Sequence, residues 1–245
     1  MAVNILDRYG IKEVADVVFY DIDGATGHPK NPVLYLDTLK VSTIEQTAEA
    51  AEARGGKGNA ALIAWDYGKE ITVTLEDALF SAKSMALMYG IDPSEDTANF
   101  ADKTSLKKTV RVDQINKEGK ISTQAGEISI PEDAIYYNDM GEKVEGAEAE
   151  GVAYCTFDLN IKNGKEIVIS SDKFPGTYYI TGDTYARSEI TGEDEFFQFI
   201  IPKAKMQSEV TLTMEAEGDP STFNMSLKVL RPATGDMMRL VKYSI

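Results

Sequence analysis

The stretch RGGKGNAALIAWDYGKEITVTLEDALFSAKSMALMYG, residues 54–90, decides the fold of this chain. It begins with a glycine-rich loop and runs through apolar residues that end in the only tryptophan, Trp65. The next three residues, Asp-Tyr-Gly at 66–68, have the composition of a tight turn. Residues 71–75 then alternate between apolar side chains and threonine, which is the period-two pattern of a half-buried strand.

After this strand the apolar residues recur every three or four positions, which predicts a helix with one apolar face. Asp77 or Ser81 is expected to cap the start of the helix, and Gly90 stands where a left-handed C-terminal residue is favoured. Asp92 and Pro93 prevent the helix from continuing. The stretch therefore predicts strand, turn, strand and one packed helix, without a catalytic constellation.

Composition limits the possible functions. The chain has 245 residues, 43% of them hydrophobic, which is enough to bury a sizeable core. Its formal net charge of −15 argues against a protein that neutralises nucleic-acid phosphates or adsorbs to an anionic membrane. The single cysteine, Cys155, excludes an intrachain disulfide, and there is one histidine, His28. No apolar run approaches the length of a membrane span.

The N-terminal third continues the β pattern. Residues 21–32 are dense in turn formers and predict a loop, and residues 33–44 alternate as the second strand of a hairpin. Residues 46–54, QTAEAAEAR, favour a helix by propensity, but their apolar positions are only alanines. A mobile loop, or an element ordered only by a partner, is an equal alternative for this segment.

The rest of the chain divides by composition. Residues 92–150 are poor in large apolar side chains and predict an insertion or a long decorated hairpin. Residues 151–245 return to short alternating strands, including 210–216 and 223–230 on either side of a turn at 217–221. The predicted fold is mainly β: a sandwich or barrel formed by residues 1–91 and 151–245, with one packed helix and a long inserted loop region.

One motif suggests an enzyme. A hydrophobic strand followed by Asp21-Ile22-Asp23-Gly24 resembles the nucleophile loop of haloacid-dehalogenase-type phosphatases, in which Mg²⁺ binds beside two aspartates. That motif requires threonine directly after the glycine, where this chain has Ala25, and Arg187 stands where a later acid belongs. An Asp-X-Asp-Gly run is also favoured in hairpin turns. A magnesium-dependent phosphatase using Asp21 and Asp23 is therefore a remote alternative.

Other candidate sites are weaker still. The glycine-rich loop lacks the spacing and the Lys-Ser/Thr ending of a P-loop. His28 and Cys155 have no companions that would complete a metal or nucleophile site, and the acidic run 142–150 lacks the twelve-residue ligand pattern of a calcium loop. The sequence predicts no enzyme, no catalytic residue, no metal and no cofactor.

Two blocks carry a family resemblance: residues 33–90, and residues 196–245 from FFQFIIPKAK to MMRLVKYSI. Both resemble major tail or tail tube proteins of tailed bacteriophages, in particular phages of Gram-positive hosts. The resemblance covers a little under half of the chain. It implies a structural virion protein with a β-sandwich or barrel, whose copies form rings, commonly six-fold, that stack into a hollow tube for DNA passage.

The resemblance also implies the binding partners of the protein and its location. The partners are further copies of the chain and other tail proteins: a sheath if the tail is contractile, a terminator and a baseplate. DNA would pass through the lumen without specific binding, no membrane is involved, and the protein is made in the host cytoplasm and ends in the virion tail. The predicted subunit-interface and stacking loop consists of Arg54, Gly55, Gly56, Lys57, Gly58 and Asn59.

The negative charge fits this interpretation, because a channel wall that repels phosphates does not retain the DNA. We expect a share of the aspartates and glutamates to line the lumen, although plain solubility explains the charge nearly as well. Another virion component of similar fold, such as a tail adaptor, a hub or a capsid-associated protein, is the main alternative. An unrelated β-rich binding module is a further one.

Overall fold

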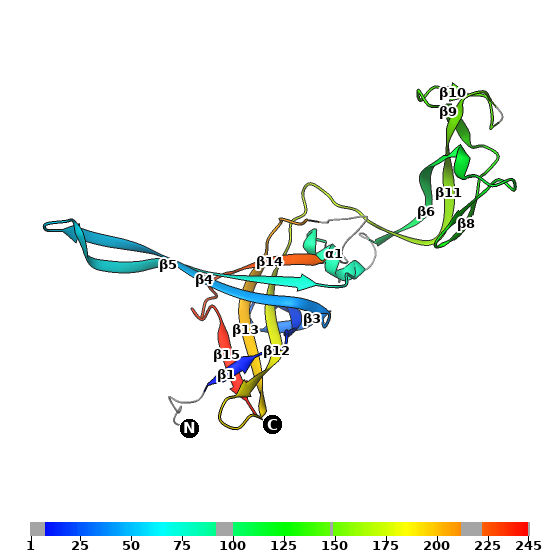
Figure 1. The fold of residues 1–245 in the computed structure, drawn as a ribbon. Helices are drawn as coiled ribbons and strands as arrows, with labels where there is room; N and C mark the ends of the chain where they lie inside the picture. The colour runs from blue at the N-terminus through cyan, green and yellow to red at the C-terminus, as the bar shows by residue number, and fades with distance from the viewer. Residues whose placement is uncertain (1–7, 92–99, 148, 212–221, 245) are drawn as a thin grey trace. The chain divides into compact units, whose positions relative to one another are not determined.

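The computed structural model describes residues 8–91, 100–147, 149–211 and 222–244 (Figure 1). The chain forms two compact units. Unit 1 combines Met1–Asp96 with Ile169–Ile245, and unit 2 is Thr97–Val168. The expected insertion, residues 92–150, lies mostly in unit 2, which extends further along the chain to include residues 151–168.

Unit 1 is built on a nine-stranded antiparallel sheet in the order β3-β2-β12-β13-β14-β5-β4, with β1 paired to β12 and β15 paired to β13. Its strands are β1 (Tyr9–Ile11), β2 (Asp16–Ile22), β3 (Pro29–Leu36), β4 (Leu39–Gly55), β5 (Ala60–Asp77), β12 (Thr177–Ser188), β13 (Asp194–Met206), β14 (Phe223–Val229) and β15 (Arg239–Tyr243).

One hydrophobic core holds unit 1 together. The alternating residues of β5 and β14 point into it, and Ile71, Val73, Leu75 and Leu227 are almost completely buried, as their alternation predicts. Buried residues of β2, β3, β12 and β13 belong to the same cluster, so both ends of the sheet cover a shared core. The fold is mainly β and sandwich-like, which confirms the predicted class. The predicted strand 210–216 and turn 217–221 lie largely outside the described residues.

The predicted helix is present but shorter than its periodicity indicates. α1 spans Ala82–Met88, and the Ser81 hydroxyl accepts a hydrogen bond from the Ser84 amide while the Ser84 side chain accepts one from the Ser81 amide. Ser81 is therefore the N-cap, in a capping box. The C-terminal prediction is confirmed too: Gly90 has a φ of +76°, and a Cβ there would lie 2.3 Å from the backbone of Phe174.

Unit 2 has a small core of its own. Val110, Ile121, Cys155 and Phe157 are buried together, which accounts for the lone cysteine as an apolar core residue. Burial also raises the pKa of the Cys155 thiol, which opposes formation of a reactive thiolate. The elements are β6 (Phe100–Arg111), a 3-10 turn (Val112–Gln114), β7 (Lys120–Thr123), β8 (Gly126–Ser129), β9 (Ile135–Asn138), β10 (Lys143–Val144) and β11 (Val152–Ile167), with sheets ordered β10-β9-β11-β6 and β7-β8.

Candidate assembly surface on the β4–β5 hairpin

The longest feature of unit 1 is a two-stranded hairpin that projects from the sheet (Figure 1). β4 has 17 residues and β5 has 18, and the two pair from Leu39↔Asp77 to Gly55↔Ala60. At about 3.3 Å per residue, each strand is over 50 Å long. β14 pairs with β5 only at residues 72–77, so in the described part of the chain the outer half of the hairpin has no neighbouring strand.

Two predictions about this region are wrong. Residues 46–54, expected as a helix or loop, are the outer half of β4 and pair with β5. Residues 66–68, expected as a turn, lie inside β5 and continue it. The chain reverses instead at Gly56–Asn59, where Gly56, Gly58 and Asn59 have φ values of +78°, +87° and +49°. Glycine and asparagine are the residues that tolerate this left-handed backbone.

The six predicted interface residues all lie at this tip. Arg54 and Gly55 end β4, and Gly56, Lys57, Gly58 and Asn59 form the turn, closed by a hydrogen bond from the Asn59 amide to the Gly56 carbonyl at 3.3 Å. Their role in assembly stays a prediction. The structure extends the candidate surface from this loop along the strands on either side of it.

A β-bulge divides the hairpin into two halves. Between the pairs Thr47↔Glu70 and Glu49↔Tyr67, β5 contains one residue more than β4, and Gly68 has a φ of +63°. Gln46 pairs with Ile71 and Glu49 with Tyr67; because these β4 residues are three positions apart, they point to opposite faces. The odd-numbered residues of β5 that follow the bulge therefore lie on the core face, and the odd-numbered residues that precede it lie on the opposite face of the hairpin.

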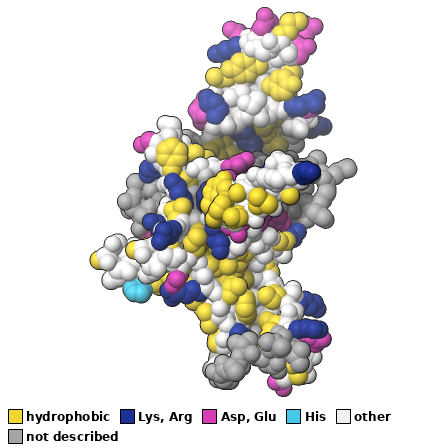
Figure 2. Space-filling view, turned by 90° about the vertical axis from the view of Figure 1, so that its left-hand side faces the viewer, with side chains coloured by type: hydrophobic (Ala, Val, Ile, Leu, Met, Phe, Trp, Pro, Cys, Tyr) yellow, Lys and Arg dark blue, Asp and Glu magenta, His cyan; other side chains and the backbone are white. Residues whose placement is uncertain are grey.

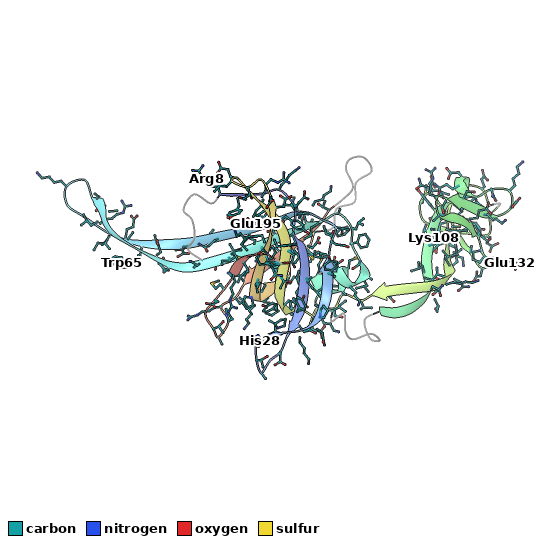
Figure 3. All side chains as sticks on the ribbon, turned by 90° about the horizontal axis from the view of Figure 1, so that it is seen from below. Arg8, His28, Trp65, Lys108, Glu132 and Glu195 are labelled. Carbon is teal, nitrogen blue, oxygen red and sulfur yellow. The ribbon has the colours of Figure 1, made fainter. Side chains whose placement is uncertain are left out.

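This change of face gives the outer hairpin an apolar side. Ile63, Trp65 and Tyr67 share a face with Ala51 and Ala53, and the first three side chains are 54%, 56% and 54% exposed. Figure 3 shows Trp65 on the projecting strands, away from the rest of unit 1. Burying an aromatic side chain removes roughly 150–250 Å² from water, so the exposed rings of Trp65 and Tyr67, together with Ile63, mark a surface that is suited to a partner.

The opposite face of the outer hairpin is more polar. It carries Glu52, Arg54 and Asp66, and Arg54 forms an ion pair with Glu52 at 2.5 Å. An exposed pair of this kind adds only about 0–1 kcal/mol to stability. The hairpin is therefore amphipathic, with an apolar face and a charged face on opposite sides of one two-stranded layer.

β3 and β4, which end the main strand order of the unit 1 sheet, differ in how well their free edges are protected. β3 contains Pro29 and Pro32 and has register shifts against β2, all of which hinder pairing with another strand. β4 contains no proline over its 17 residues and pairs on one side only, with β5, in the described part of the chain. Its free row of backbone groups is open to an added strand.

Of the two aspartates of the phosphatase alternative, Asp21 lies in β2 and Asp23 lies in the loop between β2 and β3. The Asp23 carboxylate accepts hydrogen bonds from the amides of Ala25 (2.8 Å) and Thr26 (3.0 Å), and these bonds lower the pKa of Asp23. Asp23 therefore organises a turn. Arg187, at the position of the missing acid, forms a two-point pair with Asp194. Among the described residues, no group of three or more His, Cys, Asp or Glu could hold a metal ion.

Comparison with known proteins identifies a family. The family model described as the YomU/Tube protein family matches residues 9–241, which is nearly the whole chain. No curated protein matches the sequence. The described helices include none that is both long enough and apolar enough to cross a membrane.

Proposed function

The chain belongs to the YomU/Tube protein family, and on this premise we propose that it assembles through the β4–β5 hairpin into stacked rings that form a phage tail tube. The family makes it a structural protein of the phage tube and a component of the virion tail. The finer statements, self-assembly into rings and a channel for DNA, are the proposal. The observation that carries it is the exposed apolar face of Ile63, Trp65 and Tyr67.

The hairpin and the sheet edge serve different contacts in this proposal. The unprotected edge of β4 accepts a strand of a neighbouring copy, so that main-chain hydrogen bonds join subunits within a ring. The outer hairpin, with its tip at Arg54–Asn59, reaches a copy in another ring. Both contacts join different patches on the two partners, which is the geometry that yields closed rings and stacked filaments.

The charge of the chain supports the channel. A net charge of −15 gives the assembled wall an excess of carboxylates, which repel DNA phosphates and let the polyanion pass without specific binding. Sheath, terminator and baseplate proteins would be the other partners, and the protein itself acts without catalysis or cofactor. If replacing lumen-facing carboxylates by lysine left DNA delivery by the phage unchanged, the electrostatic part of the proposal would be wrong.

The apolar hairpin face provides the test of assembly. The double variant Trp65→Ser/Tyr67→Ser removes two exposed aromatics without touching the core, so the folded subunit should persist while assembly is lost. Sedimentation velocity over a concentration series measures this. The matched control is Asp66→Ser, which changes a side chain on the opposite face of the same strand, between the two aromatics. Equal assembly by the double variant and the wild type would contradict the proposal.

A further inference from the structure

Three aromatic side chains form a ladder across the unit 1 sheet, on the face opposite the core. The even-numbered residues of β12 point into the core, so Tyr185 points away from it. Tyr185 lies directly opposite Phe196 of β13, and Phe196 lies opposite Tyr243 of β15, with ring centroids 5.4 Å and 5.2 Å apart. Tyr185 and Tyr243 are 50% and 36% exposed, so the ladder presents aromatic surface to the outside.

The ladder ends at an open edge of the sheet. β15 pairs with β13 on one side, and in the described part of the chain it pairs with no strand on the other. Its sequence, RLVKY, contains no proline that would hinder an added strand. Both of its cations have acidic partners within the chain, Asp236 for Arg239 at 2.9 Å and Glu195 for Lys242 at 2.7 Å. β15 can therefore accept a strand whose side chains continue the ladder beyond Tyr243.

The outer half of β5 offers a matching edge. One edge of β5 pairs with β4, and the other pairs with β14 only at residues 72–77, so among the described strands it is open beyond that point. This half of β5 carries Ile63, Trp65 and Tyr67 on one face, whereas the same face of β4 carries only alanines there. Aromatic pairs on neighbouring strands stabilise a sheet, so β5 is the strand suited to extend the ladder.

The faces of the two strands agree as well. β12 occupies one edge of β13, and β14 and β15 follow one another along the other edge, both antiparallel to β13. β5 runs antiparallel to β14 and directs Val73 into the core, while the bulge places Trp65 on the opposite face. An outer half of β5 that met β15 in this same antiparallel orientation would therefore place Trp65 on the face of Tyr243.

The single chain leaves both edges open. Its β5 and β15 do not pair with each other, and Figure 1 shows the outer hairpin running away from β15. Figure 2 shows hydrophobic side chains gathered both on the hairpin and on the body of unit 1 below it. Each copy thus carries one edge of each kind, and a contact between unlike edges repeats from copy to copy. We infer that the outer half of β5 pairs antiparallel with β15 of another copy, so that Trp65 and Tyr67 continue the ladder beyond Tyr243.

This inference rests on the proposed function and names the strand that receives the hairpin. Cross-linking tests it, because the only native cysteine, Cys155, is buried and can be replaced in all variants by Cys155→Ser. One preparation carries Ile63→Cys on the hairpin, and a second, marked by an affinity tag, carries Val241→Cys on the ladder face of β15. Mixed under assembly conditions with a short bis-maleimide cross-linker, they should form a covalent dimer that contains one chain of each kind.

The matched control replaces Val241→Cys by Leu240→Cys, which is more exposed (56% against 37%) but lies on the opposite face of β15. Cross-linking of Val241→Cys at least about tenfold above that of Leu240→Cys supports the inference, since the two side chains point in opposite directions. Normal tubes with equal or absent cross-linking from both would overturn the β15 contact while leaving the proposed function intact. Failure to form any assembly would refute the proposed function itself.

A single chain that carries both cysteines tests the other possible occupant of the β15 edge, the hairpin of the same chain. Ile63→Cys combined with Val241→Cys should stay free of cross-links when the protein is diluted below the concentration at which it assembles. An intrachain cross-link under these conditions would place the hairpin on its own β15 and would overturn the inference.

Truncation of the last ring of the ladder gives an independent measurement. For Tyr243→Ser, the concentration needed for assembly should rise by about tenfold or more, because the ring at the contact is lost. Tyr35→Ser is the control and should assemble like the wild type, since it removes a more exposed tyrosine (55%) from the same sheet face on β3, away from the ladder. Circular dichroism verifies that both variants are folded. Unchanged assembly of Tyr243→Ser, or equal losses in the two variants, would overturn the inference.

Discussion

At the scale of single residues, position 182 requires glycine because the Phe199 side chain packs against it. A Cβ on Gly182 would lie 2.1 Å from the ring of Phe199, so the ring occupies the space that a side chain would need. Gly182→Ala should destabilise unit 1 by about 1–3 kcal/mol, the usual cost of overpacking a core. Chemical denaturation measures the loss.

Two controls separate packing from other effects of alanine. Gly24→Ala, where a Cβ meets nothing within 4 Å, should leave the free energy of unfolding almost unchanged. Gly182→Ala combined with Phe199→Leu should recover part of the loss, because residues in direct contact are coupled. Additive effects of the two substitutions would show that the ring is not the cause.

The pair Arg187–Asp194 predicts a pH dependence. Hydrogen bonds from Arg187 lower the pKa of Asp194 below its ordinary value of 3.8, so the folded state favours the charged carboxylate. The stability from this pair is fully present above pH 3.8 and is lost as the pH falls through the lowered pKa. Asp194→Asn should therefore be less stable than the wild type near neutrality, and the difference should shrink below pH 3.8 in thermal unfolding. A pH-independent difference would contradict this.

Asp77 illustrates what the sequence could not decide at this scale. It and Ser81 were equally good caps by residue type, but Asp77 is buried and accepts a hydrogen bond from the Thr38 hydroxyl at 2.5 Å. Thr38 is 39 residues away in the chain, so no local pattern contains this contact. Ser81→Ala should cost about 0.5–2 kcal/mol, measured by denaturation, because the Ser84 amide loses the Ser81 hydroxyl as its acceptor. Ser171→Ala, outside any helix, is a control that should have little effect.

At the scale of elements, strands with one buried face were predictable and the outer hairpin was not. The alternation of residues 71–75 and 223–230 reports burial, and both segments are strands at the core. Residues 46–54 bury no large side chain, so no alternation marks them as a strand. The only signal in their sequence is the helix propensity of alanine and glutamate. Pairing with β5 satisfies their backbone groups and overrides that propensity. The glycine-rich tip was found because turn residues are informative on their own.

The bulge at Gly68 makes a prediction at the same scale. Deleting Lys69 removes the extra residue of β5 and should return Trp65 and Tyr67 to the core face of the hairpin. The subunit should stay folded because Ile71 is the first residue of β5 in the core, while assembly should be lost. Circular dichroism and sedimentation velocity measure the two effects. Lys69→Ala keeps the bulge and should assemble normally. Full assembly of the deletion variant would show that assembly does not depend on the face on which Trp65 and Tyr67 lie.

At the scale of the whole molecule, unit 1 combines a stable core with surfaces that the single chain leaves open. The apolar hairpin face and the unprotected edge of β4 are both on this unit. The family match spans unit 1 and unit 2 alike. These open surfaces are what a subunit of a repeating structure requires, and they make self-assembly the central claim.

Negative-stain electron microscopy of the purified wild-type protein over a concentration series tests that claim most directly. We predict stacked rings or hollow tubes that become more frequent as the concentration rises. Individual subunits at every concentration would contradict self-assembly and favour a virion component that assembles only on a template, such as an adaptor or a capsid-associated protein.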